Sequence, residues 1–465
     1  MIDQSGSVGY NNRMALSLHR ILPCFSRKPA SLRCSVFRLS LPVLLSSLFQ
    51  RLVAIIDIFL TGGLGAAAIA ATGLGQLQVI VIMTVFWGLS TGVTVVIAHL
   101  SGAKRLGDAR NAATTAVMVC IAMTVVVSVA GVMSGGSLAG LMGATDEVRL
   151  LNGQYTRLVF LWLIWTTGVN VLSAIMHGFG DTRTPMIGII VVNILHVLFA
   201  WPLIYGGFSV DPRGVEGAAI AINLSESIGC SYLLIEAVRK KYISFTWPDT
   251  ELFKRIWDIG WPVGLERIAQ QSGQLAYSGL IVAYGTTAYA AHQVGLSIES
   301  LSFMPGVGMG IAAATLMGQA LGAKKWERAR HSHNEAMRVA LVVMGLMAVL
   351  FLSFPSQLVG LFTHDQAVIE LGSIFLRLVA FAQVPLALSF VYAGSLRGQG
   401  DTVYVFAVTL VTMWGVRVFL AWIAGPVLHG SLTLVWSAFL VDWYVRAFLF
   451  GWRYHRRTTR PAEVI

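Results

Sequence analysis

The first long apolar stretch of the chain contains a single aspartate. Asp57 lies within residues 37–62, a stretch long enough to cross a membrane as one helix. Gln50 precedes it by seven residues, nearly two helical turns, so both side chains lie on one face of such a helix. Inserting a charged side chain at the bilayer centre costs about 2.5–3.5 kcal/mol, so a charged residue there indicates a functional or structural role. We expect Asp57 to bind a proton or a sodium ion; a buried ion pair with Arg51 or Arg157 is the alternative.

A second polar face recurs in the other half of the chain. Glu266, Gln270 and Tyr277 are spaced by four and seven residues and lie on one side of a helix. In the next apolar stretch Glu299 follows His292 by seven residues, again on one face. Carboxylates in these positions suit contact with a cationic substrate. A structural role, such as pairing with a nearby basic residue, explains either carboxylate equally well.

Other ionisable side chains also lie in apolar stretches. His196 follows Asn193 by three residues, and histidine is the residue type whose ordinary pKa lies nearest physiological pH, although a single histidine in such a stretch is more often a packing residue. Four further charged residues are first interpreted as ion pairs that hold helices together: Glu226, Arg417, Asp442 and Arg446. The candidate residues therefore form two groups. For ion coupling they are Asp57, Asn193 and His196; for the substrate path they are Gln50, Glu266, Gln270, Tyr277 and Glu299.

The composition shows that membrane helices must position these side chains. Of 465 residues, 56% are hydrophobic and 12% are charged, whereas about 25% are charged in ordinary soluble domains. Too few charges remain to cover a soluble globule of this size, so that class is excluded. The apolar stretches predict twelve membrane spans. They are residues 37–62, 70–100, 110–134, 150–176, 184–206, 215–238, 258–284, 290–320, 331–353, 371–396, 402–426 and 430–452.

Basic residues are divided unevenly between the two sets of alternate loops. Of 33 lysines and arginines, 24 fall in the terminal tails and one set of loops, two in the other set and seven within spans. Because cytoplasmic loops retain positive charge, we expect both termini on the cytoplasmic side. The net charge of +11 is then explained by membrane orientation, and we expect no nucleic acid partner.

The chain resembles itself at a shift of 220 residues. The tripeptide at 102–104 aligns with that at 322–324, and the Gly-x-Gly-Asp-Thr loop at 178–182 aligns with that at 398–402. Each repeat holds six spans, so both halves enter the membrane from the same side and are related by an axis along the membrane normal. This predicts an all-α polytopic membrane protein of two six-helix lobes that rock about their interface to transport a solute.

The repeat also sets the expected domain boundaries. These are a basic cytoplasmic tail at 1–36, an N-lobe at 37–238, a cytoplasmic inter-lobe loop at 239–257, a C-lobe at 258–452 and a second basic cytoplasmic tail at 453–465. The two Gly-x-Gly-Asp-Thr loops are interpreted as tight helix exits with Asp or Thr caps, not as phosphate cradles. The sequence contains no nucleotide-binding loop, zinc-protease motif or nucleophile elbow, and the four cysteines have no metal or disulfide spacing. We therefore expect no cofactor.

With these features in view, the sequence resembles the multidrug and toxic compound extrusion (MATE) transporters, particularly their DinF-like bacterial branch, over about residues 37–452. The segments that carry the resemblance are Ala-Ala-His-Gln at 290–293, Ile-Glu-Ser-Leu-Ser-Phe-Met-Pro at 298–305, Gly-Gln-Ala-Leu-Gly-Ala-Lys at 318–324, the two Gly-Asp-Thr loops, and Asp57 with the turn that ends at Gly65. The resemblance implies a V-shaped pair of helical bundles that exports organic, often cationic, compounds in exchange for protons or sodium.

The resemblance also implies roles for single residues. Asp57 matches the first-span aspartate that family members use for coupling, and Glu266 and Glu299 match acidic positions of this branch. In the fifth span the usual Asn and Asp or Asn positions are occupied by His196 and Ala200, so the set of sodium ligands is incomplete. Sodium needs several oxygen ligands while protonation needs one carboxylate, which favours protons.

The leading hypothesis is a monomeric antiporter of the bacterial inner membrane that exports small organic compounds in exchange for protons, with sodium as the less favoured ion. An exporter or flippase of lipid-linked or anionic metabolites is the alternative within transport. Outside transport, a membrane-embedded enzyme would need a paired acid and base at recognisable spacing, which the sequence lacks. A receptor would not explain duplicated lobes with polar faces.

Overall fold

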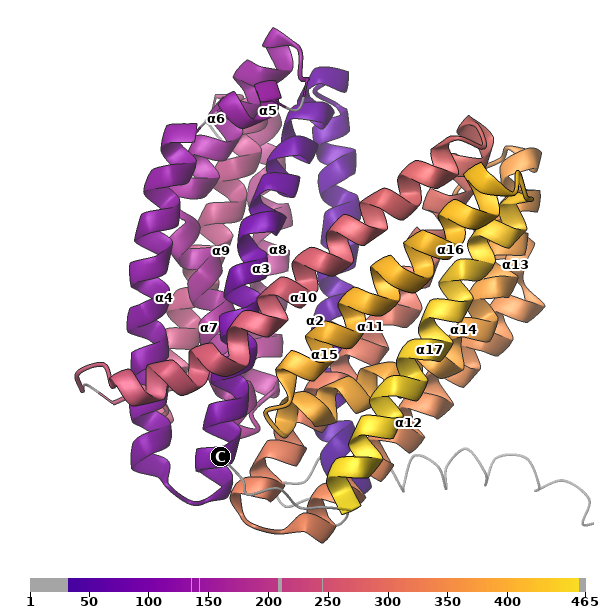
Figure 1. Cartoon of the computed structure of the whole chain (residues 1–465). Helices are drawn as coiled ribbons and strands as arrows, with labels where there is room; N and C mark the ends of the chain where they lie inside the picture. The colour runs from indigo at the N-terminus through magenta and orange to yellow at the C-terminus, as the bar shows by residue number, and fades with distance from the viewer. Residues whose placement is uncertain (1–31, 135, 142, 208–210, 245, 460–465) are drawn as a thin grey trace, which may run out of the picture.

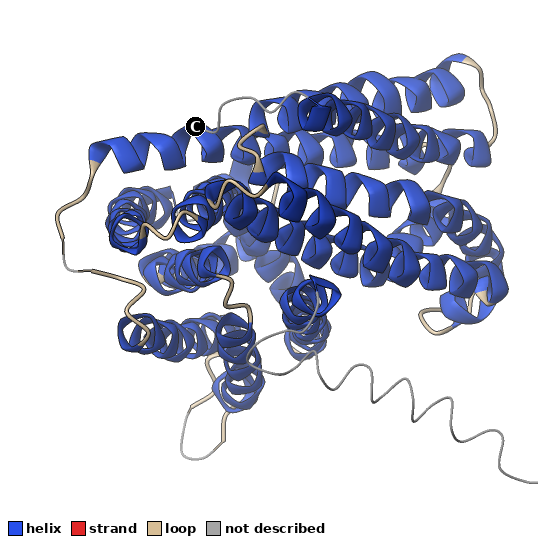
Figure 2. Ribbon diagram, turned by 90° about the horizontal axis from the view of Figure 1, so that it is seen from below, coloured by secondary structure: helices blue, strands red, loops and turns tan. Residues whose placement is uncertain are grey.

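The computed structural model describes residues 32–134, 136–141, 143–207, 211–244 and 246–459, and the regular elements of these residues are helices (Figure 2). Most of the expected N-terminal tail and the last residues of the C-terminal tail lie outside them. The helices of the first half are α2 (Leu32–Gly62), α3 (Ala66–Gly102), α4 (Leu106–Ser134), the short α5 (Ser137–Leu141), α6 (Asp146–Leu161), α7 (Leu163–Phe179), α8 (Arg183–Tyr205) and α9 (Gly214–Arg239).

The second half repeats this order with one irregular span. Its helices are α10 (Thr250–Val282), α11 (Thr286–Gly322), α12 (Trp326–Ser353), the short α13 (Pro355–Gly360), α14 (Gln366–Gly398), α15 (Thr402–Leu410), η2 (Val411–Val418), α16 (Phe419–Trp422), η3 (Ile423–Val427) and α17 (Leu432–Thr459). The segments η2 and η3 are π-helical and continue α15 and α16 as one span.

Twelve membrane spans result when each broken helix is counted once. Among the described residues, nine helices are long and apolar enough alone to cross a membrane, and α6 with α7, bent by 50°, makes a tenth. The first helix of each half, α2 and α10, completes the twelve. The predicted all-α architecture of two six-helix lobes is therefore confirmed. The last helix, α17, extends to Thr459, beyond the expected end of its span.

The two halves form two bundles that meet at one end and diverge toward the other (Figure 1). Seen from below, the helices of the first bundle are viewed end-on while many of the second lie lengthwise, so the bundles are inclined to one another (Figure 2). Each bundle has its own core of buried apolar side chains, one centred on α3, α4 and α7 and the other on α11, α12 and α14. The arrangement is an open V.

The first helix of each half connects the two bundles. Helix α10 packs on α3 of the first bundle and on α15 and η2 of its own, while α2 packs on α8 of its own bundle and on α11 of the other. Glycines allow these close crossings: a Cβ on Gly88 would lie 2.6 Å from the carbonyl oxygen of Gly260, and one on Gly308 would lie 3.4 Å from that of Ser40. These two contacts are equivalent at the 220-residue shift, which gives the interface its pseudo-two-fold symmetry.

Where the bundles meet, the C-terminal turns of α3 and α11 pack closely against one another. A Cβ on Gly102 would collide with the carbonyl of Gln319, and one on Gly322 would collide with that of His99. His99 Nε2 lies 2.7 Å from the carbonyl oxygen of Gly398 in the other bundle. Its counterpart, Gln319 Nε2, donates to the carbonyl of Gly178 at 3.1 Å.

These two symmetric hydrogen bonds, the inter-lobe latch, join the bundles at the closed end of the V. They involve the residues that begin the two Gly-x-Gly-Asp-Thr loops, Gly178 and Gly398.

The Gly-x-Gly-Asp-Thr loops are helix exits, as expected. Gly180 and Gly400 adopt positive φ of 83° and 80°, which favours glycine. Asp181 accepts from the backbone N–H of Thr184 at 3.1 Å, which satisfies one free donor at the start of α8. Asp401 makes no capping bond and instead pairs with arginines of α17, so the capping expectation holds for the first loop only.

Candidate functional site

Asp57 is paired with a histidine inside the first bundle. His196 Nε2 of α8 lies 2.5 Å from Asp57 Oδ1 of α2, and the two side chains are 4% and 18% exposed. The sequence left open an arginine partner, Arg51 or Arg157. Among the described side chains the partner is His196; that of Arg51 lies outside them. The three ion-coupling candidates are brought together, since Asn193 is buried one turn before His196 on α8.

A second carboxylate lies close to this pair. Glu226 of α9 accepts a hydrogen bond from the hydroxyl of Thr166 on α7 and interacts electrostatically with His196. The expected ion pair of Glu226 is not found among the described residues, where its hydrogen-bond partner is the hydroxyl of Thr166. Asn170, one turn after Thr166, bonds back to the carbonyl of Thr166 at 2.9 Å.

In the second bundle Glu266 is already paired. Arg397 of α14 donates through Nη2 to both carboxylate oxygens of Glu266, at 2.6 and 2.8 Å, and Thr409 donates to the same carboxylate at 3.4 Å. Glu266 is buried. The partner is therefore a basic residue from another helix and not the adjacent Arg267, which instead lies 5.9 Å from the ring centre of Trp87.

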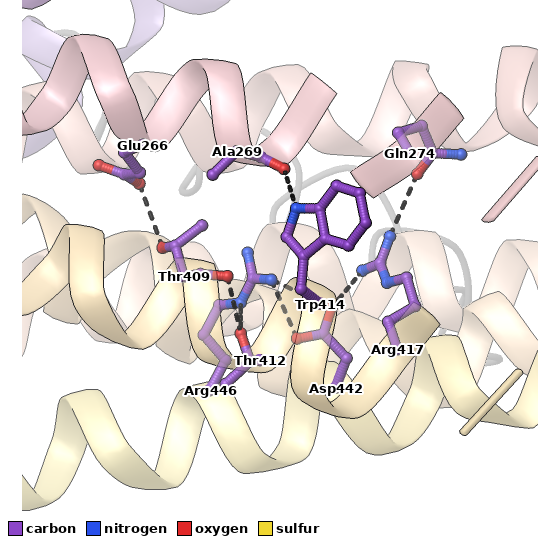
Figure 3. Close-up of polar contacts among 9 residues, drawn as sticks. All are labelled: Glu266, Ala269, Gln274, Thr409, Thr412, Trp414, Arg417, Asp442 and Arg446. Atoms are coloured by element: carbon purple, nitrogen blue, oxygen red, sulfur yellow. Dashed lines mark hydrogen bonds and ion pairs between the residues drawn. The ribbon is translucent and has the colours of Figure 1, made fainter. Parts of the chain in front are cut away.

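A buried network formed by α17, η2 and α10 surrounds Asp442 of α17 (Figure 3). Arg417 of η2 lies 2.6 Å from Asp442, and Arg446 donates to both of its carboxylate oxygens at 2.9 and 3.1 Å. Arg417 also donates to Gln274 of α10, and Arg446 donates to Thr412. The ion pairs expected of these three charged residues are present.

The π-helix explains how one segment supplies two of these contacts. Thr412 and Arg417 are five residues apart, and hydrogen bonds in a π-helix join residues five apart, so both side chains face the same way. In an α-helix the two would point to different sides. Trp414 of the same segment donates to the carbonyl of Ala269 at 3.2 Å and fixes η2 against α10 (Figure 3).

The other candidates of the second bundle lie in its core. Tyr277 is fully buried, and its hydroxyl donates to the carbonyl of Val435 at 3.3 Å. Glu299 is buried and interacts electrostatically with Arg417. His292 is enclosed by aromatic rings, with ring centres 5.7 Å from Tyr277 and 5.1 Å from Phe375. Glu299 thus lies near Arg417, one of the residues around Asp442, and no direct hydrogen bond or ion pair joins the two among the described residues.

The two glutamines differ from these buried groups. Gln50 is exposed on α2, and Gln270 is half-buried on α10. The candidates therefore fall into a group in each bundle, and Gln50 lies on the surface. Sequence reasoning missed Arg397 as the partner of Glu266, because this arginine was counted as loop charge at the start of a Gly-x-Gly-Asp-Thr loop. It missed Thr166 as well, since hydroxyls are common in such helices and give no signal.

Beside each Gly-x-Gly-Asp-Thr loop, a group of ion pairs, called here a clamp, joins the loop aspartate to a basic residue of the last helix region of that bundle. Lys240, just past α9, binds Asp181 at 2.8 Å; Arg453 and Arg457 of α17 bind Asp401 at 2.8 and 3.1 Å. Burial raises the pKa of Asp181, but hydrogen bonds from Lys240 and Thr184 outweigh it and hold the pKa of this carboxyl below its ordinary value.

The described side chains include no group of three His, Cys, Asp or Glu residues that would hold a metal ion. The first bundle thus holds a histidine paired with one carboxylate and near a second, while the second bundle holds buried salt bridges between its helices.

Comparison with known proteins agrees with this architecture. The MatE family model matches residues 42–201 and 262–423, one segment in each bundle. The chain is 27% identical to a probable multidrug resistance protein NorM of Thermotoga maritima, covering 90% of this chain and 91% of that protein. It is also 27% identical to the multidrug resistance protein NorM of Burkholderia vietnamiensis, covering 91% and 93%.

Solved structures show the same fold. One, described as the outward-facing conformation of a multidrug resistance MATE family transporter, has a TM-score of 0.86 at 23% identity and covers 95% of this chain and 97% of that one. Another, a transporter of the MOP superfamily from Pyrococcus furiosus, has a TM-score of 0.86 at 22% identity, covering 94% and 98%. Since the family model covers more than half of the residues and falls on both bundles, the chain belongs to the MatE family of multi-pass membrane transporters.

Proposed function

We propose that the protein is a proton-coupled antiporter that exports small organic, mainly cationic, drugs or toxic metabolites across the bacterial inner membrane. The observation that carries the proposal is the pair of Asp57, which is partly buried, and His196, which is buried, joined at 2.5 Å across α2 and α8. Both groups bind protons, and together they link two helices of the first bundle. The names of the relatives, multidrug resistance proteins, support a drug as the cargo.

Protons are favoured over sodium by the chemistry of this pair. A histidine nitrogen occupies Oδ1 of Asp57, an oxygen that a sodium ion would need as a ligand. Protonation of Asp57 removes its charge and weakens the attraction to His196. The pair can then separate without leaving a bare carboxylate inside the bundle.

Transport follows when proton and drug prefer different conformations. A ligand that binds both conformations equally shifts nothing, so coupling requires differential affinity. The V of this structure is joined at the end with the basic loops, which we place in the cytoplasm together with both termini (Figure 1). In this state a proton reaches Asp57 from outside and promotes release of the drug. We place the drug between the bundles, near Gln50, Gln270 and Glu266, with the protein acting as a monomer.

A second candidate rests on the pairing of Glu266. This carboxylate was expected to attract a cationic substrate, yet Arg397 already neutralises it. An anionic or lipid-linked metabolite would instead pair with Arg397 and leave Glu266 to be protonated. Export of an anion, inhibited by Arg397→Gln, together with no export of ethidium, would favour this candidate over the drug antiporter.

The test is transport by the purified full chain in proteoliposomes under separately imposed proton and sodium gradients. We expect ethidium movement to follow the proton gradient, and Asp57→Asn to reduce proton-driven transport by on the order of 10-fold, in the range of ordinary coupling free energies. Asp146→Asn, the same change at an exposed position in the first turn of α6, is the matched control. Transport driven by sodium alone, or an undiminished Asp57→Asn variant, would contradict the proposal.

A further inference from the structure

Glu226 lies on the inward face of α9 in the first bundle. It stands three residues after Asn223 and four before Cys230, a spacing that puts all three on one side of the helix. Asn223 and Cys230 are buried, at 2% and 7% exposure. Glu226, itself half-buried, is therefore on the face of α9 that is directed into the bundle.

Among the side chains that the structure describes, the surroundings of Glu226 offer a hydrogen bond but no lysine or arginine partner. Thr166 donates to its carboxylate, and none of the ion pairs among the described residues includes Glu226. Helix α9 packs against α8, α7, α6 and α2. The titratable groups that face the cluster are His196 from α8, Asp57 from α2, Tyr155 from α6 and Cys230 from α9 itself. None of them is a lysine or an arginine.

One histidine therefore lies near two carboxylates: His196 contacts Asp57 directly and interacts electrostatically with Glu226. If His196 carries a proton, it neutralises either Asp57 or Glu226, but not both. The remaining carboxylate keeps an unbalanced charge within the membrane, where such a charge is costly unless it is neutralised. A proton is the smallest ligand that removes this charge.

Two unsatisfied polar atoms lie beside these groups. His196 Nδ1 and the side-chain nitrogen of Asn193 are buried, and neither has a hydrogen-bond partner among the described residues. His196 is buried, so its second ring nitrogen lies inside the bundle and has no hydrogen-bond partner among the described residues. Histidine carries a proton on either nitrogen, which makes it suited to link groups on its two sides.

We propose that Glu226 is a second proton-binding group of the N-lobe, coupled to Asp57 through His196. Each carboxylate takes up one proton to become a carboxylic acid when the lobe faces outward. Each gives that proton back after the conformational change, and no other bond is formed or broken. Thr166 positions Glu226 through its hydroxyl. The inference rests on the proposed proton-coupled function and predicts that two protons, not one, enter per transport cycle.

The experiment compares Glu226→Gln with wild type in proteoliposomes, measuring protons taken up per ethidium moved. We expect the ratio to fall from about two to about one, because one of two carboxyl groups no longer titrates. Glu216→Gln, the same change in the first turn of α9, is the matched control and should keep the wild-type ratio. Glu226→Asp retains a carboxyl group and should also keep it.

Infrared difference spectra provide a readout that does not depend on transport. On acidification, wild-type protein should gain carboxylic acid bands, one of which is absent in Glu226→Gln and shifted in Glu226→Asp. If the Glu226→Gln variant does not fold, the test is the spectrum of Glu226→Asp compared with that of wild type. Carboxylic acid bands at the same positions in both would overturn the proposal.

The outcomes separate this inference from the proposed function. If Asp57→Asn abolishes coupling while Glu226→Gln keeps the wild-type ratio and bands, only the role of Glu226 is wrong. If wild type shows no proton-coupled transport, the proposed function itself fails. A ratio that depends on sodium in wild type and not in Glu226→Gln would identify a sodium site and overturn the proton assignment.

Discussion

At the residue scale, the two bundles treat buried charge in opposite ways. In the second bundle, Asp442 and Glu266 are each paired with arginines, which remain charged at any physiological pH. In the first, the basic side chain near Asp57 and Glu226 among the described residues is a histidine, His196, and not an arginine. A carboxylate paired with arginine keeps a permanently charged partner and holds helices together. A carboxylate paired with histidine has a partner whose charge depends on protonation. Proton coupling is therefore expected in the first bundle.

The structural role of Asp442 gives a stability prediction. Asp442→Asn leaves Arg417 and Arg446 buried without a counter-charge, and breaking such a pair costs about 3–5 kcal/mol. Thermal unfolding of the purified protein in detergent should show a large loss of stability.

Asp108→Asn supplies the control for this change. Its partner Arg105 is 61% exposed, and exposed pairs are worth about 0–1 kcal/mol, so this variant should unfold like wild type. Equal stability of the two variants would show that the network around Asp442 does not hold the bundle together.

At the element scale, the clamp at the end of α9 ties the last helix of the first bundle to the loop before α8. Lys240 binds both Asp181 and Thr184, at 2.8 and 2.5 Å. Burial lowers the pKa of Lys240, but its bonds to Asp181 and Glu236 hold that pKa above the ordinary value. The pKa of Asp181 is held below its ordinary value.

These directions determine the pH range of the clamp. Asp181 contributes stability above its unfolded pKa of about 3.9, and this is lost only as pH falls through the lower folded pKa. Lys240 contributes stability below its unfolded pKa of about 10.4, and this stability is lost only as pH rises through its higher folded pKa.

Asp181→Asn should therefore reduce stability by about 1–2 kcal/mol, equally at about pH 6 and about pH 8. Unfolding curves at the two values check this. A loss confined to one of them would mean that the clamp titrates in the working range of the transporter, contrary to the expected directions.

The sequence predicted helices better than it predicted contacts between them. Hydropathy located the spans and the 220-residue shift located the lobes, because both signals lie along the chain. The π-helix at 411–418 and the bend between α6 and α7 left no comparable signal. Asp57 and His196 are 139 residues apart, and only folding brings them together. A polar residue in a span could be identified from the sequence, but its partner could not.

At the scale of the whole molecule, the inter-lobe latch lies where the two halves must separate if the V is to open on its other side. His99 and Gln319 occupy equivalent positions and reach equivalent carbonyls, so the latch is symmetric although its two side chains differ. The surrounding glycines let α3 and α11 approach so closely that the hydrogen bonds can form. The latch exists only while this end is closed.

Loss of one latch bond should therefore shift the balance between the two conformations. A hydrogen bond contributes about 0.5–1.5 kcal/mol, so Gln319→Ala should lower the closed-end population relative to the open one by roughly 2- to 10-fold. Spin labels at the exposed positions 105 and 325, with the native cysteines replaced, report the distance between the two loops at this end. A longer distance should become more populated in Gln319→Ala.

His99→Gln is the matched control, because it makes the latch chemically symmetric with a side chain that serves the same purpose at position 319. It should retain the wild-type distance distribution, whereas His99→Ala should resemble Gln319→Ala. If both alanine variants keep the short distance, the latch does not hold the lobes. The close packing of α3 against α11 at Gly102 and Gly322 would then be sufficient to keep this end closed. Substitution of Gly102 or Gly322 by a larger residue would then be the next test, because the added side chain should force this end of the V apart.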